Sequence, residues 1–224
     1  MLALHRHQLA RLTPAGWSAI LARPWDLQAR ACLDHWATHE LPLVVTRQAN
    51  EADGRMALGL SAPERWGRRR LPLQVPRAAV TCFFELPQLA DVVELLPRSA
   101  HGPVRALIQG LCACRATTRV FGSYGWQALS GLDHVRPESD LDVSVTVVGA
   151  THADAVTQLL QRFDSATPRL DGELMFGDGA AVAWREWAAW RAGRTRTVMV
   201  KRLNGACLER DSGWCEHMPV RWAS

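Results

Sequence analysis

The 224-residue sequence has no uninterrupted apolar run approaching the ~20 residues of a membrane-spanning helix. Residues 1–8 also lack the basic stretch and long apolar core of a secretory signal. The sequence contains no repeat at a solenoid period and no low-complexity tract. We therefore expect neither export nor membrane insertion, and we predict a folded cytoplasmic protein without a membrane partner.

Lysine is almost absent, because Lys201 is the only one and every other basic side chain is an arginine. The formal net charge is +4, from 26 Lys+Arg and 22 Asp+Glu. This small excess indicates an anionic partner but gives little support to nucleic acid. Guanidinium groups suit bidentate contacts with phosphate. The six cysteines lack zinc-ribbon spacing, and we expect reduced thiols.

The sequence does contain a mixed pattern of helices and strands, with a change of texture near residue 80. Residues 1–80 are predicted to form a smaller α/β domain that binds substrate or carrier, with helices opening at residues 13–17 and spanning 25–36. Its expected strands are 41–46, 56–61 and 71–75, and Pro72 indicates that the last one is either an edge strand or the start of a strand. The segment from Arg65 to Arg70 is either an anion-binding loop or a solvated turn.

Residues 81–224 are predicted to form a mixed α/β catalytic domain. Apolar periodicity predicts helices over 87–97, 103–115, 153–163 and 187–192, and strands over 170–176 and 195–200. The segment 181–184 is expected to pair back on the strand before it, after a Gly-Asp-Gly turn.

Two features of this second part point to chemistry. Gly122-Ser123 opens a short helix that Gly131 can end, and such a turn presents backbone N–H groups to an anion. Asp140 and Asp142 lie two residues apart at the head of an apolar strand, so both carboxylates point to one face. Adjacent carboxylates repel each other, and Mg²⁺ between them would relieve the repulsion and bind substrate phosphates. We predict a phosphoryl or nucleotidyl transfer site.

This combination resembles the nucleotidyltransferase superfamily typified by DNA polymerase beta. The resemblance implies a polymerase-beta-like catalytic domain and a third acidic residue on a neighbouring antiparallel strand. Asp171 is the favoured candidate, and Glu173 is the alternative on the same strand face.

A closer resemblance involves G-S-Y-G-W-Q-A-L-S-G-L, then S-D-L-D, then D-G-E-L-M-F-G-D-G-A-A-V-A-W-R-E. These stretches, with weaker matches at residues 5–9 and 71–76, are similar to malonate decarboxylase holo-[acyl-carrier-protein] synthases, the phosphoribosyl-dephospho-CoA transferases. The resemblance implies transfer of a phosphoribosyl-dephospho-CoA group from 2′-(5″-triphosphoribosyl)-3′-dephospho-CoA to a serine of an acyl carrier protein, with release of pyrophosphate. The alternatives are the equivalent citrate lyase enzyme and a general small-substrate nucleotidyltransferase.

The resemblance also implies roles for individual residues. Asp140 and Asp142 would hold Mg²⁺, and Asp171 would complete the catalytic set and help to deprotonate the carrier serine. Gly122 and Ser123 would bind the leaving pyrophosphate. The remaining candidates for substrate binding are weaker, since each has an ordinary structural explanation: Trp126, Gln127, Ser139, Glu173 and Lys201.

Overall fold

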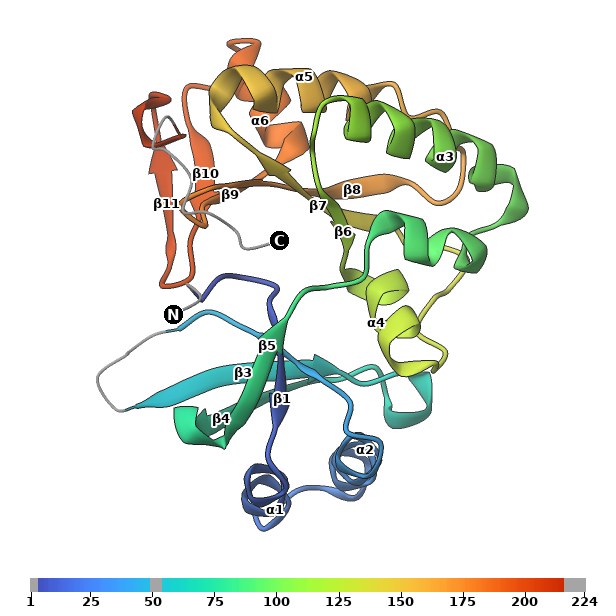
Figure 1. The fold of residues 1–224 in the computed structure, drawn as a ribbon, viewed down its shortest axis with the longest axis vertical. Coiled ribbons are helices and arrows are strands. Elements are labelled where there is room, and N and C mark those ends of the chain that lie inside the picture. Colours follow the sequence, from blue (N-terminus) through green and yellow to red (C-terminus); the bar gives the residue numbers. More distant parts are fainter. Residues whose placement is uncertain (1–3, 49–53, 216–224) are drawn as a thin grey trace. The chain divides into compact units, whose positions relative to one another are not determined.

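The structure is a computed structural model that describes residues 4–48 and 54–215, and its chain divides into two compact units (Figure 1). The first unit comprises Met1–Leu86 with two short later segments, Leu129–His134 and Leu203–Gly205. The second comprises Pro87–Ala128, Val135–Arg202 and Ala206–Ser224. The mixed α/β class that the sequence predicts is confirmed. Over the described residues, no helix has the length and apolar character needed to cross a bilayer.

The first unit contains a five-stranded antiparallel sheet with strand order β4-β3-β2-β1-β5. Its strands are β1 (Leu9–Leu12), β2 (Leu43–Val45), β3 (Arg55–Ser61), β4 (Arg70–Pro76) and β5 (Val80–Phe84). Helices α1 (Pro14–Leu21) and α2 (Leu27–Thr38) begin where Thr13 and Asp26 accept hydrogen bonds from backbone N–H groups. Pro72 lies on the edge strand β4, as predicted, because proline cannot donate to a sheet ladder.

The strands β1 and β5 were not anticipated from the sequence, although β1 pairs with both β2 and β5. β5 carries no buried residue, so it lacks the alternation that marks a strand. Since β5 belongs to this sheet, the first continuous stretch of the first unit runs to Leu86. Short 3₁₀ helices η1 (Glu64–Trp66) and η2 (Arg77–Ala79) flank β4.

The second unit contains a six-stranded sheet with strand order β11-β10-β9-β8-β7-β6. Its strands are β6 (Thr118–Val120), β7 (Leu141–Val147), β8 (Leu170–Phe176), β9 (Ala181–Ala183), β10 (Val198–Lys201) and β11 (Ala206–Glu209). Helices α3 (Arg98–Ala113), α5 (Gly149–Gln161) and α6 (Trp184–Arg191) lie along one face of the sheet (Figure 1). The predicted hairpin of β8 and β9 is present.

The relative direction of β7 and β8 differs from the direction expected from the sequence. The strand that carries Asp171 was expected to run antiparallel to the strand of Asp142, but β8 pairs with β7 in parallel. The reason is α5, which returns the chain to the end of the sheet where β7 begins, as parallel neighbours require. The expected helix over 87–97 is also shorter and tighter, because it forms the 3₁₀ helix η3 (Leu89–Leu95).

Strand β7 has one buried, apolar face and one polar face. Its alternate residues Leu141, Val143, Val145 and Val147 are at most 1% exposed and belong to the core. The side chains between them, starting with Asp142, are partly exposed. One face of β7 is therefore packed in the core, and its other face is polar and partly open.

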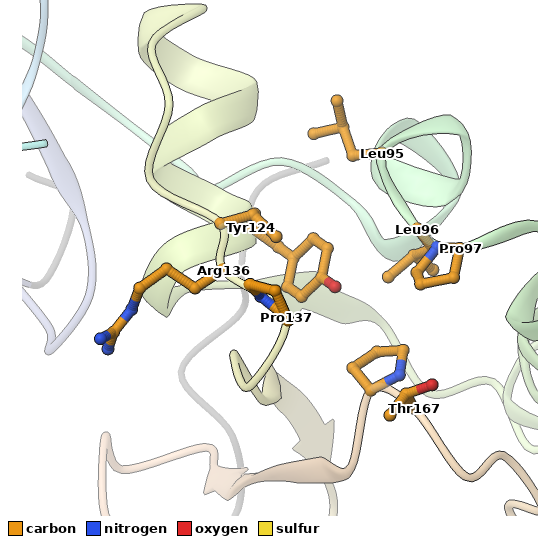
Figure 2. Close-up of a pocket in the computed structure, with 9 residues that line it drawn as sticks. Leu95, Leu96, Pro97, Tyr124, Arg136, Pro137 and Thr167 are labelled. Carbon is orange, nitrogen blue, oxygen red and sulfur yellow. The ribbon is translucent and has the colours of Figure 1, made fainter. Parts of the chain in front are cut away.

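A pocket of about 390 Å³ opens in the second unit beside the first turn of α4 (Gly122–Ser130) (Figure 2). It is bordered by the junction of η3 and α3 and by the loops that precede β7 and β8. These loops lead directly into the residues of the candidate site.

Gly172 is predicted to be indispensable for the parallel pairing. It has a φ of +140°, and a Cβ atom on it would lie 1.9 Å from the backbone oxygen of Val143. Gly172→Ala should therefore lower the free energy of unfolding by more than about 3 kcal/mol, measured by urea denaturation. Gly179→Ala is the matched control, because Gly179 has a φ of +81° with nothing within 4 Å. The control should cost only about 1–2 kcal/mol, and equal losses would contradict the steric argument.

Candidate active site

The turn at the start of α4 lies directly against the Asp142 carboxylate. A Cβ atom on Gly122, which has a φ of +63°, would lie 2.0 Å from Asp142 Oδ2. The Phe121 N–H also donates to the Asp142 carbonyl oxygen over 3.0 Å. Only glycine leaves room for this approach, so the two halves of the predicted motif come together in the structure.

The register of the parallel strands places two carboxylates side by side. Asp142 and Asp171 are paired residues across β7 and β8, and neighbouring strands lie roughly 4.8 Å apart. Glu173 pairs with Ser144, one step further into the sheet on the same face. Asp140 immediately precedes β7 and lies beside this pair. The geometry therefore favours Asp171 over Glu173 as the third carboxylate.

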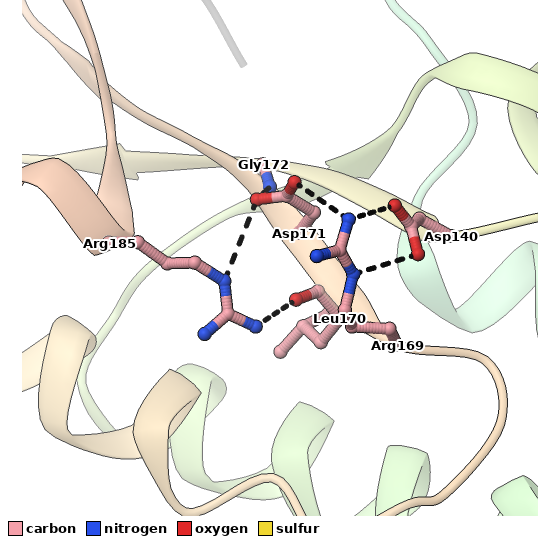
Figure 3. Close-up of polar contacts among 6 residues, drawn as sticks. All are labelled: Asp140, Arg169, Leu170, Asp171, Gly172 and Arg185. Atoms are coloured by element: carbon pink, nitrogen blue, oxygen red, sulfur yellow. Dashed lines mark hydrogen bonds and ion pairs between the residues drawn. The ribbon is translucent and has the colours of Figure 1, made fainter.

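Two arginines that the sequence reasoning missed hold this cluster together (Figure 3). Arg169 donates to both oxygens of Asp140, at 3.0 and 2.5 Å, and its Nη2 lies 3.7 Å from Asp171 Oδ2. Arg185 Nε lies 3.9 Å from Asp171 Oδ1, and its Nη2 donates to the Leu170 carbonyl oxygen. Arg169 precedes Asp171 by two residues, so strand alternation could have placed it on this face. Arg185 reaches the site from α6, which no local pattern indicates.

Asp140 and Asp142 differ in their electrostatic environment. Burial raises the pKa of Asp142 to about 6, and the charges of Asp171 and Asp140 add to this effect. The hydrogen bonds from Arg169 lower the pKa of Asp140 below its ordinary value. The charged form of Asp142 is therefore disfavoured by burial and by its acidic neighbours, and a bound cation would relieve both effects.

Glu173 and Lys201 form an ion pair, with Lys201 Nζ donating to Glu173 Oε1 at 2.7 Å. Glu173 is 7% exposed. The single lysine of the sequence therefore pairs with a buried carboxylate. Lys201 ends β10 and is held against the sheet by this contact.

Three other predicted binding residues, Ser139, Gln127 and Trp126, lie on α4 or in the loop before β7. The Ser139 hydroxyl accepts a hydrogen bond from the Arg136 N–H at 2.9 Å and shapes the turn before Asp140. The Gln127 side chain accepts one from the Val135 N–H at 2.9 Å. Trp126 lies partly buried on α4. The contacts of Ser139 and Gln127 support the loop before β7.

The donor set at Asp140 and Asp142 fits a magnesium ion. Within residues 4–48 and 54–215, no three His, Cys, Asp or Glu side chains are grouped as a ready metal site. Mg²⁺ does not require three, because it commonly binds one or two carboxylates and completes its shell with waters and substrate phosphates. The raised pKa of Asp142, caused by burial and by the nearby charges of Asp171 and Asp140, is consistent with such an ion. Magnesium at these two residues stays a prediction.

The structure thus defines a two-unit α/β protein with a carboxylate and arginine cluster at the start of two parallel strands. Two family models match the chain: "Phosphoribosyl-dephospho-CoA transferase MdcG N-terminal domain" over residues 5–85, and the corresponding C-terminal domain over residues 88–212. No solved structure gives a significant match.

Curated proteins named phosphoribosyl-dephospho-CoA transferase are similar over most of their length. One from Bradyrhizobium diazoefficiens is 38% identical over 184 residues, which are 81% of this chain and 80% of that protein. One from Xanthomonas campestris pv. campestris (strain 8004) is 35% identical, covering 80% and 84%. One from Azotobacter vinelandii is 30% identical, covering 86% and 94%. The chain belongs to the phosphoribosyl-dephospho-CoA transferase family, as its motifs predict.

Removing the charge of Asp142 should stabilise the fold. A carboxyl group whose pKa rises from 3.8 to about 6 on folding costs stability at every pH above that range. Asp142→Asn should therefore raise the free energy of unfolding at pH 7.5 by on the order of 2 kcal/mol, seen as a higher Tm. The gain should disappear as the pH falls below about 4, where the carboxyl is protonated in both states.

The control for this measurement is Asp164→Asn, which removes an exposed carboxylate from the same unit. It should leave the Tm nearly unchanged. A Tm of Asp142→Asn equal to or below that of the wild type at pH 7.5 would show that Asp142 is not under electrostatic strain.

Proposed function

We propose that this protein transfers the phosphoribosyl-dephospho-CoA group from 2′-(5″-triphosphoribosyl)-3′-dephospho-CoA to a serine of the malonate decarboxylase acyl carrier protein. Family membership supports phosphoribosyl-dephospho-CoA as the group that is transferred. The observation that supports the chemistry most directly is the pairing of Asp142 with Asp171 beside Gly122. We expect the enzyme to act in the cytoplasm.

The reaction is a displacement at one phosphorus atom. The carrier serine oxygen forms a bond to the innermost phosphate of the donor, and the bond from that phosphorus to the pyrophosphate breaks. A phosphodiester forms, and the serine proton is released. Asp171 is the proposed acceptor of that proton, because it lies in the cluster but is held less tightly by Arg169 than Asp140 is.

The other residues act on charge and position. Mg²⁺ bound at Asp140 and Asp142 would supply neutralisation of phosphate charge when present. The backbone at Gly122 and Ser123 begins α4, where N–H groups suit the leaving pyrophosphate. Arg169 and Arg185 keep the carboxylates oriented and add positive charge beside the phosphates. Positioning and charge neutralisation supply most of the rate in phosphoryl transfer.

The proposal is tested by intact-mass spectrometry of the apo carrier protein incubated with enzyme, donor and Mg²⁺. We expect a mass gain that matches one phosphoribosyl-dephospho-CoA group and that is lost when EDTA is added. Asp140→Asn and Asp142→Asn should each slow the transfer by about 100-fold or more, since each removes charge from the reacting centre. Asp164→Asn should transfer at the wild-type rate.

Three outcomes would overturn parts of the proposal. Wild-type transfer by either site variant would remove these carboxylates from the mechanism. Modification of a citrate lyase carrier in place of the malonate decarboxylase carrier would reassign the chain to the sister activity. A folded, metal-loaded protein that modifies neither carrier would leave only a general nucleotidyltransferase.

The first unit is the proposed platform for the carrier protein. Residues 1–86 contain 11 arginines and 7 acidic residues, so they account for the whole net charge of +4. The segment predicted as either an anion-binding loop or a solvated turn forms η1 and the start of β4. There Arg65 stacks 3.7 Å above the Trp66 ring, Arg68 pairs with Glu64, and Arg69 pairs with Asp26. An exposed, aromatic-supported arginine cluster suits an acidic protein partner.

Neutralising this cluster should weaken carrier binding without affecting the chemical step. The combined change of Arg65, Arg68 and Arg70 to Gln should raise the KM for the carrier about 5- to 10-fold at low salt and leave kcat within about twofold. Steady-state kinetics with the carrier varied measures both values. Arg194→Gln with Arg196→Gln, two exposed arginines of the second unit, is the control. An increase in the KM for the donor instead would assign the cluster to the donor.

A further inference from the structure

The pocket beside α4 has a defined lining, and none of the functions proposed above involves it. Its lining includes the buried Leu96, Tyr124 and Pro168, and the exposed Leu95 and Thr167 lie at its rim. The volume of about 390 Å³ is in the range of small-molecule sites, which are mostly apolar with a few placed polar groups.

The single tyrosine of the sequence supplies one such polar group. Tyr124 is only 2% exposed, and its hydroxyl points into the pocket (Figure 2). In the part of the chain that the structure describes, no residue forms a hydrogen bond with this hydroxyl. The hydroxyl is therefore open to the pocket, which presents a hydrogen-bond donor that a ligand can satisfy. Burial also raises the pKa of Tyr124, which keeps its proton in place.

The pocket adjoins the carboxylate cluster through short stretches of chain. Tyr124 follows Ser123 directly, Pro137 precedes Asp140 by three residues, and Pro168 precedes Arg169. A ligand in the pocket therefore lies close to the loops that carry the reacting groups.

We propose that this pocket binds the adenine ring of the donor, with the Tyr124 hydroxyl donating a hydrogen bond to a ring nitrogen. This assignment rests on the proposed function. Proline rings and the tyrosine offer flat apolar surfaces for a planar heterocycle, and a rigid ring loses little conformational entropy on binding.

The alternative occupant within the same donor is its pantetheine arm. The triphosphoribosyl group is attached to the 2′ oxygen of the adenosine ribose, next to the carbon that bears adenine. The pantetheine arm begins beyond a diphosphate on the far side of the same ribose. Adenine is thus the apolar part nearest to the reacting phosphate, which matches a pocket next to the carboxylate loops.

The test measures binding of three probes to the purified full chain by titration calorimetry: 3′-dephospho-CoA, AMP and 4′-phosphopantetheine. Tyr124→Phe removes the hydroxyl and keeps the ring, and Leu95→Trp fills the pocket from its exposed rim. We expect Tyr124→Phe to weaken dephospho-CoA and AMP about fivefold, as the loss of one hydrogen bond does. Leu95→Trp should weaken both at least about tenfold. Leu208→Trp, at an exposed leucine outside the pocket, should change neither.

The outcomes separate this inference from the proposed function, because binding is measured without turnover. Unchanged affinity for dephospho-CoA and AMP in both pocket variants overturns the inference even if the wild type modifies the carrier. Weaker binding of phosphopantetheine with unchanged AMP reassigns the pocket to the pantetheine arm. In the transfer assay, the pocket variants should raise the KM for the donor and leave the KM for the carrier unchanged. Loss of kcat alone would contradict a binding role.

Discussion

The parallel register of β7 and β8 is the constraint on which the site depends. It places Asp142 beside Asp171. It is possible only because Gly172 has no side chain, since the backbone of β7 occupies the position that a Cβ atom would take. The cost of this arrangement is seen at Asp142, whose pKa is raised first by burial and then by repulsion from Asp171 and Asp140. Arg169 and Arg185 offset that repulsion from the strand start and from α6.

Glycine has a second use at the head of α4. Gly122 allows the turn to approach the Asp142 carboxylate so closely that no side chain would fit between them. An anion held at this turn and a cation held at the carboxylates would therefore meet at one place. That arrangement suits a reaction in which a phosphate is attacked and a pyrophosphate leaves. The adjoining pocket at Tyr124 gives the same centre an apolar neighbour for a substrate ring.

Local pattern predicted much of the fold. The alternation in β7, the proline-started α1 and the apolar run of β8 each follow from residue spacing, and all three are present. The strands that escaped notice, such as β5 and β11, have few buried residues, so their pairing depends on neighbours rather than on their own sequence. The direction of β8 relative to β7 was also predicted wrongly, because a crossover helix, and not the strand itself, determines it.

For the site, the sequence by itself determined which carboxylates share a strand face, because the period of two is a local property. It also determined the family, through motifs that the comparisons confirm. Only the tertiary structure decided that Asp171, rather than Glu173, neighbours Asp142, and that Lys201 pairs with Glu173. Only it brought Arg185 from α6 to the cluster and aimed the Tyr124 hydroxyl into a pocket. These are contacts between distant segments, and register and packing fix them after the chain has folded.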